Sequence, residues 1–145
     1  MKVLNEARLE FPSLSANESF ARSCAACFAA KLDPTLEELG DLKTAVSEAV
    51  TNCIVHAYPE TIGRVELRLR ILEEDLLEVR VRDWGAGIPD VEQAMTPLFT
   101  TGGEDRSGMG FSIMECFTDA LRVRSKPGKG TTVTMRKRVS GKAVK

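Results

Sequence analysis

Apolar and polar residues alternate along several parts of this chain, and a two-residue period predicts half-buried β-strands. The predicted strands are residues 7–11, 65–71, 77–81, 121–125 and 131–139. In the first three, charged residues occupy every second position and are expected on the solvent face of an antiparallel sheet.

Two long helices are predicted by their start signals. Ser15 with Glu18 forms a capping box that opens a helix over residues 15–31, and Thr35 with Glu38 opens another over 35–58. The apolar side of the first helix is predicted to consist of Phe20, Cys24, Cys27 and Phe28.

The remaining chain predicts a long loop and a short helix. Residues 92–107 lack a sustained period, and a loop of that length in a compact domain is typically functional. Residues 107–117 can form a short helix, which gives the order β-α-α-β-β-loop-α-β-β. This order predicts an α+β fold, a two-layer α/β sandwich with a mixed, mainly antiparallel sheet and helices on one face. Residues 1–145 are expected to be one domain, with basic residues 136–145 as a frayed tail.

Composition excludes several classes of partner. Lys and Arg number 20 against 21 Asp and Glu, which gives no indication of direct nucleic-acid binding or of a membrane surface. No apolar run approaches the roughly 20 residues that span a bilayer. The chain begins with a strand-like pattern instead of a signal peptide, so a soluble cytoplasmic protein is expected.

The four cysteines include a Cys24-Ala-Ala-Cys27 pair with the spacing of metal and redox sites. The pair lies inside a predicted helix, whereas redox pairs of this kind sit at a helix start after a strand. Buried structural thiols are therefore favoured over a metal or redox role.

The helical segment over residues 48–56 carries the first chemical signal. Glu48 and Asn52 are four residues apart and share one helix face, with His56 one turn further. A carboxylate one turn from an amide can hold hydrated Mg²⁺ and place a base beside phosphates, because Mg²⁺ takes few protein oxygens. His56 is the only histidine, so the chain is not by itself a histidine autokinase. It is either a phosphate neighbour or a packed or solvent-bonded helix-end residue.

Asp83-Trp84-Gly85-Ala86-Gly87 follows a predicted strand. An Asp at a strand end can accept a hydrogen bond from an exocyclic amine such as that of adenine. Glycines permit a sharp turn close to a flat ring. Alone, the pattern also fits a plain turn with a capping Asp. Trp84 either shields a base or covers the edge of the core.

Ser107-Gly108-Met109-Gly110 is predicted at a helix start, where backbone N–H groups can bind phosphates. By itself it is more often a Gly-rich connector, and it is neither a Walker A motif nor a Rossmann fingerprint. The adjacent Arg106 could clamp a terminal phosphate or be an exposed charge. Thr131 offers a hydroxyl at the start of a strand.

In this order, the segments resemble the GHKL nucleotide-binding fold of DNA gyrase, histidine kinases and MutL, also called the Bergerat-type ATP-binding fold. The matching motifs are Glu48-x-x-x-Asn52, Asp83-x-Gly85-x-Gly87, Gly108-x-Gly110 and Gly130-Thr131. The segments 17–22, 32–35, 46–52, 97–101 and 106–115 are similar to the family of sporulation anti-sigma F factors, which are small serine kinases.

This resemblance implies ATP or ADP with Mg²⁺ as cofactors and assigns roles to individual residues. Glu48 would be the general base for a substrate serine, Asn52 the Mg²⁺ ligand, and Arg106 a contact of the terminal phosphate. Asp83 with Thr131 would read the adenine amine. The residues implied for shaping the base pocket and for donating N–H groups to phosphates are Gly85, Gly87, Gly108, Met109 and Gly110.

The resemblance also implies partners. These are a sporulation sigma factor, an anti-anti-sigma protein as the phosphorylated substrate, and a second copy of the chain in a homodimer. Arg22 either contacts the sigma factor or is an exposed charge. Two alternatives stay open: a nucleotide-gated sigma-binding module with little kinase activity, and the related stress-response anti-sigma kinase.

Overall fold

A computed structural model of the chain describes residues 1–95 and 110–139. Five strands form one sheet in the order β1-β2-β3-β5-β4, and all four pairings among these residues are antiparallel. The strands are β1 (Val3–Pro12), β2 (Arg64–Leu72), β3 (Leu76–Asp83), β4 (Ala120–Lys126) and β5 (Gly130–Arg138). Each predicted strand is present, and most extend beyond the predicted ends.

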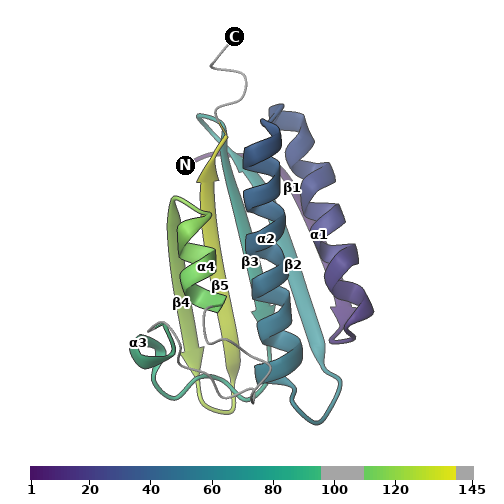
Figure 1. Ribbon diagram of the computed structural model, residues 1–145, viewed down its shortest axis with the longest axis vertical. Helices are drawn as coiled ribbons and strands as arrows, with labels where there is room; N and C mark the ends of the chain where they lie inside the picture. The colour runs from purple at the N-terminus through teal and green to yellow at the C-terminus, as the bar shows by residue number, and fades with distance from the viewer. Residues whose placement is uncertain (96–109, 140–145) are drawn as a thin grey trace.

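Helices lie over one face of this sheet (Figure 1). The helical elements are α1 (Ala16–Ala29), the short turn η1 (Ala30–Leu32), α2 (Leu36–Asn52), the π-helical turn η2 (Cys53–Ala57), α3 (Val91–Ala94) and α4 (Gly110–Cys116). The predicted two-layer α+β architecture is confirmed. No helix in the described ranges is long and apolar enough to cross a membrane.

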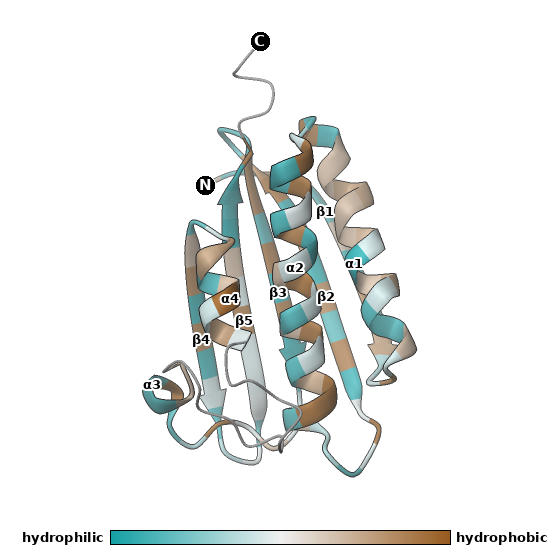
Figure 2. Ribbon diagram, in the orientation of Figure 1, coloured by the Kyte–Doolittle hydropathy of each residue, from teal (hydrophilic) through white to brown (hydrophobic). Residues whose placement is uncertain are grey.

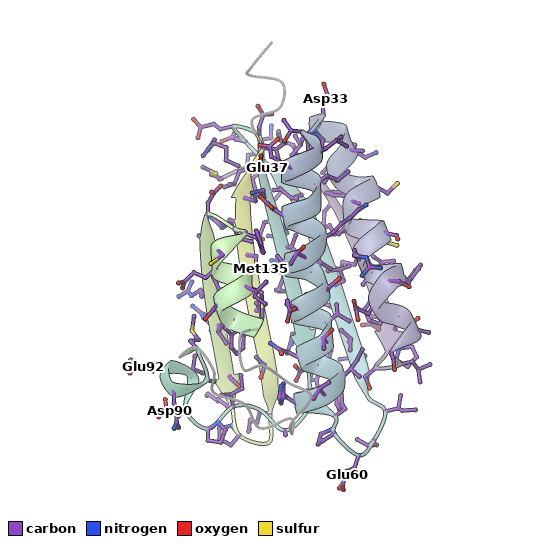
Figure 3. The ribbon with its side chains drawn as sticks, in the orientation of Figure 1. Asp33, Glu37, Glu60, Asp90, Glu92 and Met135 are labelled. Atoms are coloured by element: carbon purple, nitrogen blue, oxygen red, sulfur yellow. The ribbon has the colours of Figure 1, made fainter. Side chains whose placement is uncertain are left out.

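The core fills the space between the helices and the sheet. Along β2 and β3 apolar and polar residues alternate, as the banding of these strands in Figure 2 shows. Met135 of β5, labelled in Figure 3, is 1% exposed and belongs to this core, as do Val46 and Val50 of α2. The alternation therefore predicted correctly which strand residues turn toward the helices.

The buried side of α1 differs from the prediction. Ala21, Ala25 and Ala29 are at most 1% exposed, whereas Phe20 is 46% exposed and Cys27 is exposed. Alanine side chains let two helix backbones approach closely, so the small residues of α1 face its neighbours. The predicted apolar side of this helix is therefore wrong for Phe20 and Cys27.

The cysteines are free, and only Cys53 is buried. Cys24 is half-buried, while Cys27 and Cys116 are exposed. The expectation of buried structural thiols thus holds for Cys53 and is wrong for Cys27 and Cys116. No group of three or more His, Cys, Asp or Glu that could hold a metal occurs in the part of the chain that the structure describes.

Only one of the two predicted capping boxes forms. The Thr35 hydroxyl accepts from the Glu38 N–H at 3.1 Å and the Glu38 carboxylate accepts from the Thr35 N–H at 2.9 Å. Ser15 has helical backbone angles and makes no side-chain cap. The Glu18 carboxylate instead accepts hydrogen bonds from Arg22 of the same helix and from the Thr51 hydroxyl of α2. The bond to Thr51 joins α1 to α2.

The C-terminal part of the described chain belongs to the sheet. Strand β5 continues to Arg138, and Val139 is 4% exposed and donates its N–H to the Asp75 carbonyl at 3.0 Å. The predicted frayed tail is therefore wrong for residues 136–139, while 140–145 lie outside the described residues.

Candidate functional site

Sheet pairing brings Asp83 and Thr131 together at one end of the sheet. Asp83 ends β3 and is the register partner of Thr131 at the start of β5. One carboxylate oxygen of Asp83, Oδ1, accepts from the Thr131 N–H at 3.2 Å and from the Gly85 N–H at 3.0 Å. Both side chains are buried. The shared Oδ1 leaves the second oxygen of Asp83 for a ligand donor.

The end of the second long helix also reaches this point. The prediction of one helix over 35–58 is correct only to Asn52, where α2 gives way to the π-helical turn η2, closed by the Tyr58 N–H donating to the Cys53 carbonyl at 3.1 Å. Turns of this kind occur frequently at functional sites. Here the turn brings Cys53 and His56 into the lining of a cavity.

That cavity has a volume of about 430 Å³, a size typical of small-molecule sites. Its walls are mostly apolar, with a few polar groups contributed by α2, β3 and β5. The lining residues are Ala49, Asn52, Cys53, Val55, His56, Ala57, Pro59, Val81, Asp83, Ala86, Gly87, Ile88, Pro89, Asp90, Gln93, Ala94, Gly110, Phe111, Thr131 and Val133. Asp90 lies at the lower edge of the molecule beside α3, as labelled in Figure 3.

The two glycines after Asp83 are required by close packing within the protein. A Cβ on Gly85 would lie 2.3 Å from the Ala57 carbonyl oxygen, and one on Gly87 would lie 2.1 Å from that of Lys126. Gly87 also has a positive φ of 76°, which favours glycine. The predicted sharp turn is confirmed, and it docks the loop against η2 and against the β4–β5 connection.

Tyr58 fixes the start of this glycine loop, a role that no local sequence pattern predicted. Its hydroxyl accepts from the Trp84 N–H at 2.8 Å and donates to the Arg64 carbonyl at 2.7 Å. The Trp84 ring packs against guanidinium groups, with Arg64 at 3.6 Å and Arg82 at 4.6 Å from the ring centroid. Trp84 does not line the cavity, and its ring contacts are with these two arginines.

The motif on α2 and the start of α4 meet beside the cavity. A Cβ on Gly110 would lie 3.3 Å from Asn52 Oδ1 and 3.4 Å from Glu48 Oε2. The structure thus joins the first motif to the end of the third, as their resemblance to one nucleotide site implied. Three predicted site residues, Arg106, Gly108 and Met109, lie outside the described residues.

The donor set beside Gly110 fits a hydrated divalent cation. It offers the Glu48 carboxylate and the Asn52 amide oxygen, both of the oxygen type that Mg²⁺ prefers. Mg²⁺ takes only one or two protein ligands when phosphates complete its shell. Asn52 is therefore a suitable ligand, with Glu48 one turn away.

Burial controls the electrostatics at the base of the cavity. Burial raises the pKa of the Asp83 carboxyl, and hydrogen bonds from Gly85, Cys53 and Thr131 oppose that rise. Burial, with the neighbouring Asp83 charge, raises the pKa of the Cys53 thiol well above its usual value. The thiol therefore stays protonated at neutral pH, and it donates to the Ala49 carbonyl at 3.5 Å.

Arg22 lies away from the cavity, between α1 and α2. Its guanidinium contacts Glu18 at 3.2 Å and donates to the Ser47 hydroxyl at 3.1 Å. Its side chain is 38% exposed. Arg22 is thus anchored to Ser47, the residue that precedes Glu48, and its side chain is still partly exposed.

Comparison with known proteins gives consistent matches over most of the chain. Residues 11–137 match the histidine kinase-like ATPase domain family. An anti-sigma F factor of Caldanaerobacter subterraneus subsp. tengcongensis is 56% identical over 138 residues, 94% of this chain and 96% of that protein. The anti-sigma F factor of Geobacillus kaustophilus is 50% identical over 137 residues, 94% of each.

Solved structures share the fold at low sequence identity. The RsbU and RsbW domains of a Mycobacterium tuberculosis protein give a TM-score of 0.67 at 16% identity, covering 93% of this chain and 32% of that one. The histidine kinase domain of a blue-light activated kinase from Erythrobacter litoralis gives 0.60 at 21% identity, covering 92% and 64%. The predicted GHKL-type fold is confirmed, and this fold implies nucleotide binding.

Proposed function

Because the chain belongs to the anti-sigma F factor family of histidine kinase-like ATPase domains, we propose that it is an anti-sigma factor with ATP-dependent serine kinase activity. It sequesters a sporulation sigma factor in the cytoplasm and inactivates an anti-anti-sigma protein by phosphorylating a serine. The observation that carries the kinase proposal is the convergence of Glu48, Asn52 and Gly110 beside the cavity that holds Asp83.

In this proposal the cavity takes the adenine of ATP or ADP. The second oxygen of Asp83 accepts from the adenine amine, with the Thr131 hydroxyl beside it. The polar groups sit among apolar walls that include Val81 and Val133. Gly85 and Gly87 shape the pocket by keeping the loop close to η2 and β4.

Phosphoryl transfer depends mainly on positioning and charge neutralisation. Asn52 would hold Mg²⁺, which neutralises phosphate charge when bound. Glu48 would accept the proton of the substrate serine hydroxyl. The family resemblance adds Arg106 at the terminal phosphate and backbone N–H groups of Gly108, Met109 and Gly110 at the others.

The decisive experiment mixes the purified chain, Mg·ATP and the anti-anti-sigma protein, and follows phosphoserine by intact-mass spectrometry. Glu48→Gln keeps a polar group of the same size and removes the base. We expect this variant to bind ATP normally and to lose transfer by about 10²–10⁴-fold, the usual contribution of a general base. Full transfer by the variant would rule out Glu48 as the base.

The same experiment distinguishes the alternatives. If the wild-type chain binds ATP tightly but adds no phosphate, the protein is a nucleotide-gated sigma-binding module. Phosphate transfer to the antagonist of a stress-response sigma factor, in preference to a sporulation one, would assign it to that related group.

The proposed sigma-factor contact at Arg22 needs a control for its internal contacts. Arg22→Gln removes the charge offered to a partner, the pair with Glu18 and the bond to Ser47, whereas Glu18→Gln removes only the ion pair. Direct contact predicts that sigma binding weakens in the first variant and persists in the second. Equal effects would mean that Arg22 acts by joining α1 to α2. Light scattering of the nucleotide-bound chain tests the proposed homodimer.

A further inference from the structure

Behind Thr131 lies a hydroxyl that does not line the cavity and that the proposed function leaves without a role. Ser125, near the end of β4, is the register partner of Thr131. Its Oγ lies 2.8 Å from Thr131 Oγ1 and 3.0 Å from the Gly130 carbonyl oxygen, and it accepts from the Ile88 N–H at 2.7 Å. The three neighbours come from β5 and from the wall of the cavity.

A count of hydrogens shows that these contacts are coupled. A hydroxyl has one hydrogen and two lone pairs. The Ile88 N–H can only donate, and the Gly130 carbonyl can only accept, so Ser125 has one hydrogen for two acceptors. If this hydrogen goes to Gly130, Thr131 must donate to Ser125. Sending it to Thr131 would leave the contact between Ser125 and Gly130 without a hydrogen. The first arrangement therefore satisfies all three contacts, and it leaves Thr131 Oγ1 with only lone pairs to offer a ligand.

We propose that Ser125 is a positioning residue that sets purine discrimination by controlling whether the Thr131 hydroxyl donates or accepts. This inference rests on the proposed binding of an adenine nucleotide in the cavity. Adenine carries an amine donor next to a ring nitrogen that accepts, whereas hypoxanthine carries an oxygen acceptor next to an N–H donor. The adenine amine has two hydrogens, and Asp83 and Thr131 can each accept one of them. The oxygen of hypoxanthine needs a donor instead, and Ser125 holds the Thr131 hydrogen away from it.

Ser125 also fixes where Thr131 stands relative to the opposite wall. Ile88 lines the cavity, and its N–H donates to Ser125. Ser125 therefore contacts both sides of the cavity, the segment after the glycine loop through Ile88 and strand β5 through Thr131. A second link joins the same loops, since the Gly128 N–H donates to the Ala86 carbonyl at 2.7 Å. The wall therefore stays attached when Ser125 is replaced, and the hydroxyl pair can be tested separately.

The test measures dissociation constants for ADP and for inosine diphosphate by calorimetry, and compares their ratio between variants. For Ser125→Ala we expect weaker ADP binding, by about tenfold, because one buried hydrogen bond to the pair is lost. We also expect the preference for ADP over inosine diphosphate to fall by about the same factor. Ser125→Thr keeps a hydroxyl on a β-branched residue that strands accept, and should restore the ratio.

Two further variants complete the design. Thr134→Ala removes a hydroxyl from β5 at a position whose register partner on β4 is Arg122, and should leave the ratio unchanged. In a Thr131→Val background, Ser125→Ala should have no further effect on the ratio, because Ser125 acts through Thr131. If Ser125→Ala does not fold, Ser125→Cys replaces it, since a thiol is a weak hydrogen-bonding group.

The outcomes separate this inference from the proposed function. A Ser125 variant that weakens both nucleotides equally and keeps the ratio would show a structural role and overturn the inference. Failure of the wild-type chain to bind ADP would instead overturn the proposed adenine site. A lowered ratio that Ser125→Thr restores would establish the positioning role.

Discussion

At the scale of single residues, the buried Asp83 carboxylate lowers the stability of the fold and at the same time offers an acceptor to the proposed ligand. The carboxylate is 5% exposed, and burial raises its pKa despite the bonds from Gly85, Cys53 and Thr131. A group whose pKa is higher in the folded state than in the unfolded state binds a proton more tightly when folded. The ionised form therefore lowers stability, while its second oxygen is the acceptor that the proposed ligand needs.

This balance predicts a pH-dependent difference between the wild type and Asp83→Asn, measured without nucleotide. The free energy of unfolding of the wild type, relative to the variant, should rise as the pH is lowered from 7 through the raised pKa of Asp83. The gain should be complete below the ordinary pKa of an aspartate. Urea titrations at several pH values measure it, and groups common to both proteins cancel. A difference that is constant with pH, or that falls on acidification, would contradict the pKa direction.

At the scale of elements, the site depends on contact between the glycine loop and η2. The Ala86 N–H donates to the Ala57 carbonyl at 3.0 Å, and Gly85 leaves no room for a side chain against the same carbonyl. The loop thus inherits its position from the π-helical turn at the end of α2. The motifs on α2 and after β3 are linked physically as well as by the ligand they are proposed to share.

Gly85→Ala should therefore push the loop away from η2. We expect a loss of about 2 kcal/mol in stability, typical of overpacking, together with weaker binding of ADP. Gly40 in α2 is the matched control, because a Cβ there meets nothing within 4 Å. Gly40→Ala should stabilise the chain by about 0.5–1 kcal/mol and leave ADP binding unchanged. Thermal melts and calorimetry would measure both, and unaltered ADP binding in Gly85→Ala would argue against the coupling.

At the scale of the whole molecule, the two faces of the sheet are covered differently. Helices cover one face, and charged side chains cover the other. Glu78 is only 4% exposed on the second face, held by Arg68 at 3.1 Å and Arg136 at 2.8 Å. The charged positions were predicted to face solvent, and the long arginine side chains instead bury this carboxylate by lying over it. Through these two ion pairs, Glu78 links β2, β3 and β5 on the sheet face that carries no helices.

Removing this carboxylate should weaken the whole sheet. Glu78→Gln leaves several arginines without their shared partner, and we expect a loss of about 2 kcal/mol, less than for a fully buried pair because Arg136 is partly exposed. Glu10 makes a comparable pair with Arg64 at 3.8 Å, with both side chains 53% exposed. Glu10→Gln should change stability by no more than about 0.5 kcal/mol. Chemical denaturation measures the change in the free energy of unfolding for each variant. Equal changes would mean that the buried cluster around Glu78 stabilises the fold no more than an exposed ion pair does.

The sequence by itself determined the order of the five strands and the two long helices, the sheet face of the alternating strand residues, and the three segments proposed to form the site, whereas the short helix α3 lies largely in a predicted loop. These features depend on local periods and on residue types needed at fixed spacings, such as Glu48 with Asn52 or the glycines after Asp83. The pairing of Ser125 with Thr131 is local in the same sense, because a short connection joins the two predicted strands that carry them. Local information was sufficient because a hairpin sets its own register.

Only the tertiary structure decided which groups complete the site. The contact of Asp83 with Thr131 depends on β5 lying between β3 and β4, and no local period fixes that strand order. Tyr58 at the Trp84 N–H and Gly110 beside Asn52 depend on the same long-range packing. The alanine face of α1 and the buried Glu78 were missed for a related reason. Burial is set by what packs against a residue as well as by its own hydropathy.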